Sequence, residues 1–123
     1  MEPPLLLLNL TLPRIDAAMV TAIIDDIYAV EGALMPVGAK FLDLTIDLSS
    51  AAAHDCPPVG RYRLVLRDRV WLRRLSVALG DEPDVGASLG LFTTEPDESL
   101  EARPIRQVRV AVAGILPRSA WGE

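Results

Sequence analysis

The only histidine and the only cysteine of the chain lie two residues apart, in the run His54-Asp55-Cys56. A thiol becomes nucleophilic when a nearby base or positive charge lowers its pKa. Such pairs normally rest on two rigid supports, whereas this run precedes Pro57-Pro58 in a segment typical of a loop. Without a CxxC pair or a second histidine, it also lacks the ligands of a tetrahedral metal site. We therefore expect a polar loop without metal or cofactor, in which His54 and Cys56 are the residues to test for reactivity.

Carboxylates form a second candidate set, with Asp25 beside Asp26 and Asp43 four residues before Asp47. Carboxylates held close together can perform acid–base chemistry or bind a hard cation. The first pair lies in a segment expected to pack against the apolar face of a sheet, and the second pair points away from that face. The two pairs should not converge, so we expect solvated charge.

Six arginines form a third candidate set: Arg61, Arg63, Arg67, Arg69, Arg73 and Arg74. The planar guanidinium binds phosphate and carboxylate through two parallel hydrogen bonds. No glycine-rich phosphate loop and no aromatic residues spaced for base stacking accompany them. We expect Asp43, Asp47 and the acids of residues 81–101 to neutralise most of these arginines. The alternative is a face that binds a protein or an anion, made of Arg61, Arg63, Arg67, Asp43 and Asp47.

The net charge of −5 is divided into blocks of opposite sign. Residues 1–59 hold eight acids and two bases, residues 60–80 hold six arginines and one acid, and residues 81–102 hold seven acids and no base. Such blocks usually neutralise one another across a small fold. The balance disfavours nucleic acid as a partner.

The composition is that of a globular protein, with half of the 123 residues apolar and 24% charged. This length fits a single domain over residues 1–123. The first residues are acidic and the apolar run Leu5–Leu8 is soon interrupted by Asn9, which is unlike a secretory signal. No stretch approaches the ~20 apolar residues of a membrane span. We expect a cytoplasmic protein without a membrane partner, and the excess of arginine over lysine, with many alanines and prolines, suggests a bacterial source.

Two segments with strict alternation predict an antiparallel pair of strands, Phe41–Ser49 and Arg61–Arg67. Their even positions are mostly leucine, isoleucine or tyrosine, and their odd positions include the aspartates and arginines. When the strands pair, Asp43 and Asp47 share a face with the arginines, and opposite charges across a strand pair contribute roughly 0.2–1 kcal/mol.

Two further segments predict helices. Over Ile15–Val30, apolar residues recur at helical spacing, Asp16 lies in the first turn, and Gly32 follows as a terminator. Residues 68–80 fit a helix that begins at Asp68 and ends at Gly80. A strand is the alternative for this second segment, because its last part alternates.

Strands are also predicted at Leu5–Leu12, Ala87–Thr93 and Ile105–Val112, which completes the order β-α-β-β-α-β-β. The expected fold is α+β, with a single-layer antiparallel or mixed sheet of about five strands and two helices on one face. The first six elements follow the order of a ferredoxin-like fold.

No set of residues carries the signature of an enzyme. We expect a non-enzymatic interaction or assembly protein, either a homodimer or a subunit of a bacterial complex. The expected interface is the last strand, through Val108, Val110 and Val112, together with Trp121 in the tail. The alternative is a domain that binds a small molecule or an anion, with or without catalysis, through the arginine face or the loop of His54 and Cys56.

Overall fold

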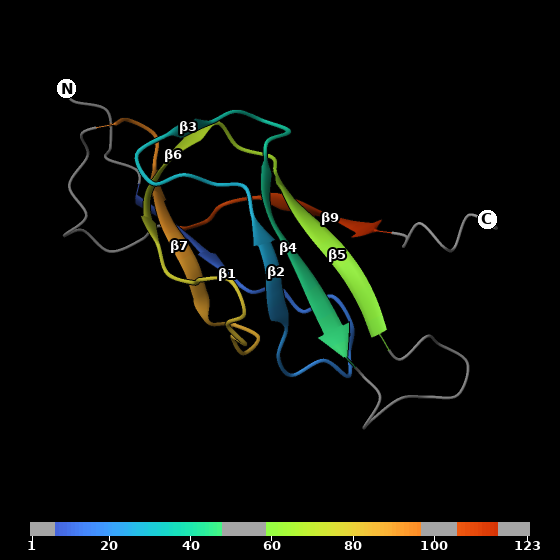
Figure 1. The fold of residues 1–123 in the computed structure, drawn as a ribbon. Helices are drawn as coiled ribbons and strands as arrows, with labels where there is room; N and C mark the ends of the chain where they lie inside the picture. Colours follow the sequence, from blue (N-terminus) through green and yellow to red (C-terminus); the bar gives the residue numbers. More distant parts are fainter. Residues whose placement is uncertain (1–6, 48–58, 97–105, 116–123) are drawn as a thin grey trace.

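The computed structural model describes residues 7–47, 59–96 and 106–115, and these form two sheets packed on a shared core (Figure 1). One sheet has the order β3-β6-β7-β1-β8 and the other has the order β2-β4-β5-β9. The strands are β1 (Leu7–Thr11), β2 (Ile23–Ile27), β3 (Leu34–Met35), β4 (Lys40–Asp47), β5 (Val59–Leu66), β6 (Val70–Leu75), β7 (Ser88–Thr93), β8 (Arg106–Gln107) and β9 (Val110–Ile115).

The predicted α+β fold is wrong, because the described residues contain no helix. Residues 15–30 contain a turn followed by β2, and residues 68–80 contain β6, so the second segment adopts the strand alternative. The apolar face of the sheet that contains β4 and β5 is covered by the other sheet and not by two helices. The expected single layer is therefore replaced by two.

Register shifts in both strands give apolar residues a helix-like spacing. The pairing of β2 shifts between Ile24 and Asp26, and that of β6 shifts between Leu72 and Arg74. Such a bulge inserts an extra residue, so core-facing positions on either side of it are three residues apart instead of two. In β2 these positions are Ile24 and Ile27. A bulged strand thus reproduces the three-residue spacing of a helix.

The predicted pairing of the two alternating segments is confirmed. Strands β4 and β5 are antiparallel neighbours, and Asp43 lies directly opposite Arg63. Leu42 and Leu44 face Leu64 and Tyr62 on the core side. The aromatic rings of the core come from both sheets, with the centroids of Phe41 and Phe92 5.5 Å apart.

Two segments of the chain resemble one another at an offset of 48 residues. Segments 23–47 and 71–95 align without a gap, and both contain Val-Gly-Ala, at residues 37–39 and 85–87. The register shifts of β2 and β6 lie at equivalent positions. The described glycines with positive φ also form equivalent pairs, Gly32 with Gly80 and Gly38 with Gly86. The fold is therefore built from two similar units.

Each unit completes the bulged strand of the other. Gly32 donates a backbone hydrogen bond to Leu72 of β6 at 2.6 Å, and the equivalent Gly80 donates one to Ile24 of β2 at 2.8 Å. Because the bonds are exchanged in both directions, we expect the units to unfold together.

The predicted strand over Ile105–Val112 is two strands in different sheets. Strand β8 pairs in parallel with β1, and β9 pairs antiparallel with β5. Between them the chain crosses from one sheet to the other at Val108, whose side chain is buried, and Arg109. This places β9 at the edge of its sheet (Figure 1). In the described ranges, no helix has the length and apolar character that crossing a membrane requires.

Candidate functional site

The structure brings some of the candidate residues together and separates others. Asp43, Asp47, Arg61 and Arg63 lie on β4 and β5, on the side of that sheet facing away from the core. Arg67 follows β5 and donates a backbone hydrogen bond to Arg109. His54, Cys56 and Trp121 lie outside the described residues.

Asp43 is covered and not solvated, with only 3% of its surface exposed. Its carboxylate accepts hydrogen bonds from Arg63 Nε at 2.8 Å, Arg63 Nη2 at 3.1 Å and the Tyr28 hydroxyl at 2.6 Å. The guanidinium of Arg63 in turn lies over the Tyr28 ring, 5.3 Å from its centroid. Arg63 Nη2 also donates to the Tyr28 hydroxyl at 3.1 Å, so the three side chains form a closed group of mutual hydrogen bonds.

The charges of this group shift one another's pKa values. Burial acts to raise the pKa of Asp43, but the hydrogen bonds from Arg63 and Tyr28 outweigh it, and the pKa is lowered. The same bond to Asp43 raises the pKa of Tyr28 and that of Arg63. The ionised carboxylate is therefore the stable form, which does not suit a general acid or base near neutral pH.

Arg61 is also paired. Its Nε lies 3.5 Å from a carboxylate oxygen of Asp25, which accepts a hydrogen bond from Thr45 as well. Two of the three arginines predicted for a binding face thus already have acidic partners. The expected neutralisation is confirmed for Arg63, which pairs with Asp43, whereas Arg61 pairs with Asp25 of β2 and not with the predicted acids.

Asp68 is the centre of a second group, which sequence reasoning placed at a helix start. Only 6% of its surface is exposed, and it accepts hydrogen bonds from the chain crossing 38 and 41 residues away. The donors are Arg106 Nη1 at 2.8 Å and, from Arg109, the backbone N at 2.9 Å, Nε at 3.0 Å and Nη2 at 2.6 Å. Burial acts to raise the pKa of Asp68, but these bonds hold the pKa well below its usual range.

The predicted interface valines do not share one environment. Val108 is buried at the crossing, with 3% exposed, and cannot contact a partner. Val110 is partly buried, and Val112 is 40% exposed although it lies opposite the fully buried Leu64. The core-facing side of β9 is therefore incompletely covered by the described residues.

The four sheet edges differ in how they are protected. Strands β3 and β8 each have only two residues. The outer side of β2 is occupied up to Ile24 by backbone bonds between residues 20–24 and the segment 80–85, and the strand continues with the charged Asp25 and Asp26. Strand β9 has six residues and no charge, and no described strand pairs with its outer side. Natural edges are normally blunted by shortness, cover or charge, so β9 is the open edge of the described fold.

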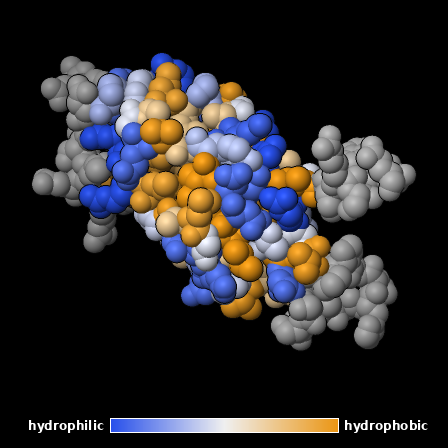
Figure 2. Space-filling model, viewed as in Figure 1, coloured by the Kyte–Doolittle hydropathy of each residue, from blue (hydrophilic) through white to orange (hydrophobic). Residues whose placement is uncertain are grey.

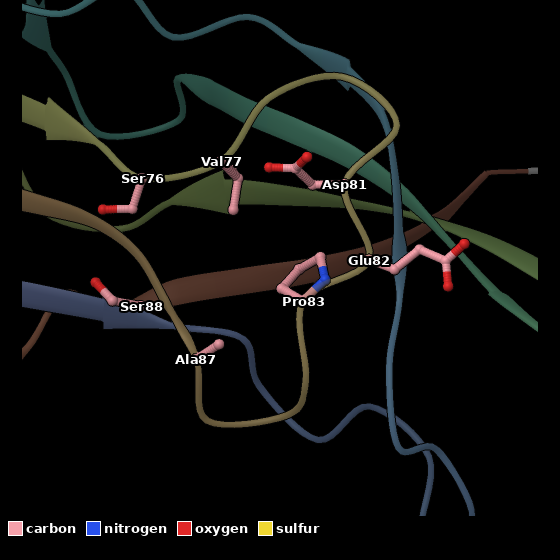
Figure 3. A pocket seen from close by; sticks show the side chains of 7 residues that line it. All are labelled: Ser76, Val77, Asp81, Glu82, Pro83, Ala87 and Ser88. Atoms are coloured by element: carbon pink, nitrogen blue, oxygen red, sulfur yellow. The ribbon is translucent and has the colours of Figure 1, made fainter.

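A shallow groove of about 310 Å³ lies beside the loop that follows β6 (Figure 3). It is lined by Ser76, Val77, Asp81, Glu82, Pro83, Ala87 and Ser88. At the equivalent positions of the other unit, Tyr28 and Lys40 replace Ser76 and Ser88, and the ammonium lies 5.5 Å from the ring centroid. The groove is thus lined by two small serines where the other unit has two large side chains.

Apolar side chains also gather in the middle of one face, over the loops between β7 and β2 (Figure 2). Exposed apolar residues of the loops include Val20 at 70%, Val30 at 65% and Leu79 at 65%. Val30 and Leu79 belong to the two segments predicted as helices, which are absent from the described residues, and both side chains are exposed instead of packed on a sheet.

Within the three described ranges, no group of three His, Cys, Asp or Glu side chains is arranged to hold a metal ion. No model of a protein family matches the chain, and no curated protein or solved structure shows significant similarity to it.

Proposed function

We propose that this chain is an interaction protein that assembles by pairing strand β9 with strand β9 of a second copy. The observation that carries the proposal is the open, uncharged edge of six residues in a structure whose other described edges are short or covered. Adding a strand to such an edge supplies main-chain hydrogen bonds without requiring a pocket.

The hydrogen-bonding groups available on β9 follow from its register. Arg67 donates a backbone bond to Arg109 at 2.8 Å, one position before the pairing of Leu66 with Val110. In an antiparallel ladder, bonded and non-bonded positions alternate. The backbone groups of Ala111, Ala113 and Ile115 therefore point toward β5, and those of Val110, Val112 and Gly114 point outward.

A twofold axis at Val112 uses all the outward groups. It pairs Val112 with its own copy and Val110 with Gly114, so that each of the pairs exchanges two hydrogen bonds. This is the self-complementary contact expected of a homodimer. It also joins two four-stranded sheets into one and extends the apolar face past the exposed Val112.

The alternative of an anion-binding arginine face receives less support, because Arg61 and Arg63 already contact Asp25 and Asp43. Catalysis by His54 and Cys56 stays a prediction. The homodimer is the main proposal, and the experiment below distinguishes it from a complex with a different protein.

The test is sedimentation equilibrium of the full chain and of two proline variants. Proline lacks the N–H and is tolerated at edge positions whose N–H faces solvent. Val112→Pro should therefore leave the circular dichroism spectrum of the monomer unchanged while abolishing the dimer. Ala111→Pro is the matched variant, and it should unfold the chain because its N–H is bonded to β5. A wild-type chain that stays monomeric at high micromolar concentration would contradict the proposal.

A further inference from the structure

We infer that the Asp68 cluster, defined as Asp68 with Arg67, Arg106 and Arg109, binds a multiply charged oxyanion of the phosphate type. Arg109 directly precedes β9, but its backbone group faces β5, and the site does not depend on the proposed assembly. It differs from the predicted arginine face, of which it retains only Arg67.

The charge of the cluster is unbalanced. Arg106 and Arg109 bind the carboxylate of Asp68, and Arg67 lies opposite Arg109 on the neighbouring strand, so the net charge is 3 − 1 = +2. Within residues 7–47, 59–96 and 106–115, no other carboxylate forms an ion pair with these arginines. By contrast, Arg61 and Arg63 each have an aspartate of their own. The net charge of +2 lies at the end of β5 nearest to Arg67, where an anion can approach it.

Asp68 holds the two guanidiniums in place without consuming them. Arg106 uses Nη1 toward Asp68, and Arg109 uses Nε and Nη2. A guanidinium has five N–H donors, so both keep donors in reserve. Their side chains remain 42% and 73% exposed. Because a buried carboxylate already fixes these groups, binding an anion costs little further ordering of side chains.

Repulsion supplies an independent reason for an anion at this position. Continuing the register of β5 and β9 by one position sets Arg67 opposite Arg109, and the backbone bond between them confirms the contact of the strands. Like charges directly opposite one another destabilise a strand pair. Asp68 compensates Arg109, but its carboxylate makes no contact with the guanidinium of Arg67 in the structure. An oxyanion bridging the two would remove this repulsion.

The geometry suits a phosphate group because arginine pairs with phosphate oxygens through parallel N–H donors. The phosphate could be free or carried by a protein side chain. Inorganic pyrophosphate and O-phosphoserine are therefore the two probes, and binding of either supports the site while their relative affinity indicates the source of the ligand.

The experiment is isothermal titration calorimetry of the full chain at constant ionic strength. Pyrophosphate or O-phosphoserine should bind saturably, and Arg109→Gln should weaken binding by about tenfold or more, through loss of charge-assisted bonds. Arg67→Gln should weaken it without disturbing Asp68, which keeps the test valid if Arg109→Gln unfolds. Arg74→Gln, an exposed arginine of β6 with the same charge change, should bind as the parent does.

The same titration is repeated on a second chain in which Asp97, Glu98 and Glu101 are replaced by amides, which changes the net charge from −5 to −2. Absence of saturable binding of both probes by the parent and by this variant, at up to about 10 mM ligand, overturns the inference. Equal weakening by Arg67→Gln and Arg74→Gln also overturns it, because that result shows only a general effect of net charge.

Discussion

Replacing Asp68 by asparagine tests how strongly the chain crossing is anchored. The two side chains have nearly the same shape, but the amide replaces one carboxylate oxygen by a donor. Asp68 accepts bonds on both oxygens, from Arg106 and from the backbone and side chain of Arg109. In the variant, an NH₂ group takes the place of one carboxylate oxygen and faces an N–H donor of Arg106 or Arg109.

The size of the loss follows from the exposure of the partners. Removing one member of a fully buried ion pair costs about 3–5 kcal/mol, because the other charge is stranded. Here Asp68 is 6% exposed, but the side chains of Arg106 and Arg109 are 42% and 73% exposed, so water can solvate the released cations. Lost charge-assisted hydrogen bonds contribute ~1.5–3 kcal/mol each at most. We expect Asp68→Asn to lower the free energy of unfolding by about 2–3 kcal/mol.

Urea unfolding at pH 7 measures this difference, with Glu82→Gln as the control. Glu82 is exposed on the groove loop and carries the same charge change, so its substitution should alter stability by less than about 0.5 kcal/mol. A loss below about 1 kcal/mol for Asp68→Asn, or an equal loss for both variants, would refute the view that Asp68 anchors the crossing.

Three further predictions concern acid stability, Tyr28 and the paired glycines. The pKa values of Asp43 and Asp68 are lowered in the fold, so the stability that they contribute is present above the unfolded value of about 4 and is lost as the pH falls below it. Between about pH 5 and 2, the free energy of unfolding of Asp68→Asn should therefore fall less steeply than that of the parent, and an unchanged slope argues against the anchor. Tyr28→Phe should lower the thermal midpoint by removing the hydroxyl bonded to Asp43, whereas Tyr62→Phe should have less effect; equal midpoints for the two variants count against the closed group. Gly38→Ala and Gly86→Ala should each lower the free energy of unfolding by about 1–2 kcal/mol, because both glycines have positive φ and an added Cβ meets no atom within 4 Å. Denaturant titrations measure both losses, and markedly unequal values contradict the equivalence of the two units.

The sequence predicts the β4–β5 pair well because its alternation is uninterrupted. Asp43 and Arg63 belong to opposite strands at the same register, so their ion pair is readable from the residues alone. The burial of Asp43 is not, because it depends on Tyr28, which is positioned by the neighbouring β2. Asp43 contacts side chains from two other segments, Tyr28 and Arg63, and the periodicity of its own strand does not indicate both of them.

The helices were predicted where strands bulge. In residues 15–30 the spacing of Ile24 and Ile27 resembles a helix, yet seven of the sixteen residues are Ile, Val or Thr, which favour strands. A second signal lies in the sequence as well, because residues 23–47 and 71–95 share five identical positions, including Val-Gly-Ala. Such a repeat indicates that both segments adopt one structure, and the alternation at the end of residues 68–80 then favours strands for both.

The Asp68 cluster could not be predicted, since its members are 38 and 41 residues apart and no local pattern joins them. The open edge was predicted in part. The valines of residues 108–112 marked a strand-forming segment, but the crossing to another sheet buries Val108 and moves the exposed edge toward residues 110–115.

Disulfide trapping at Val112 tests the pairing of β9 with its own copy most directly. In a chain with Cys56→Ser, which removes the only natural cysteine, Val112→Cys should form a covalent dimer on mild oxidation, because a twofold axis at this residue brings its two copies to ~5.5 Å between Cα atoms, within disulfide reach. Val59→Cys is the control, as Val59 is 50% exposed at the far end of β5 from the crossing. The account predicts rapid dimer formation for Val112→Cys alone. A chain that stays monomeric with cysteine at position 112, or one that crosslinks equally well through position 59, would contradict it.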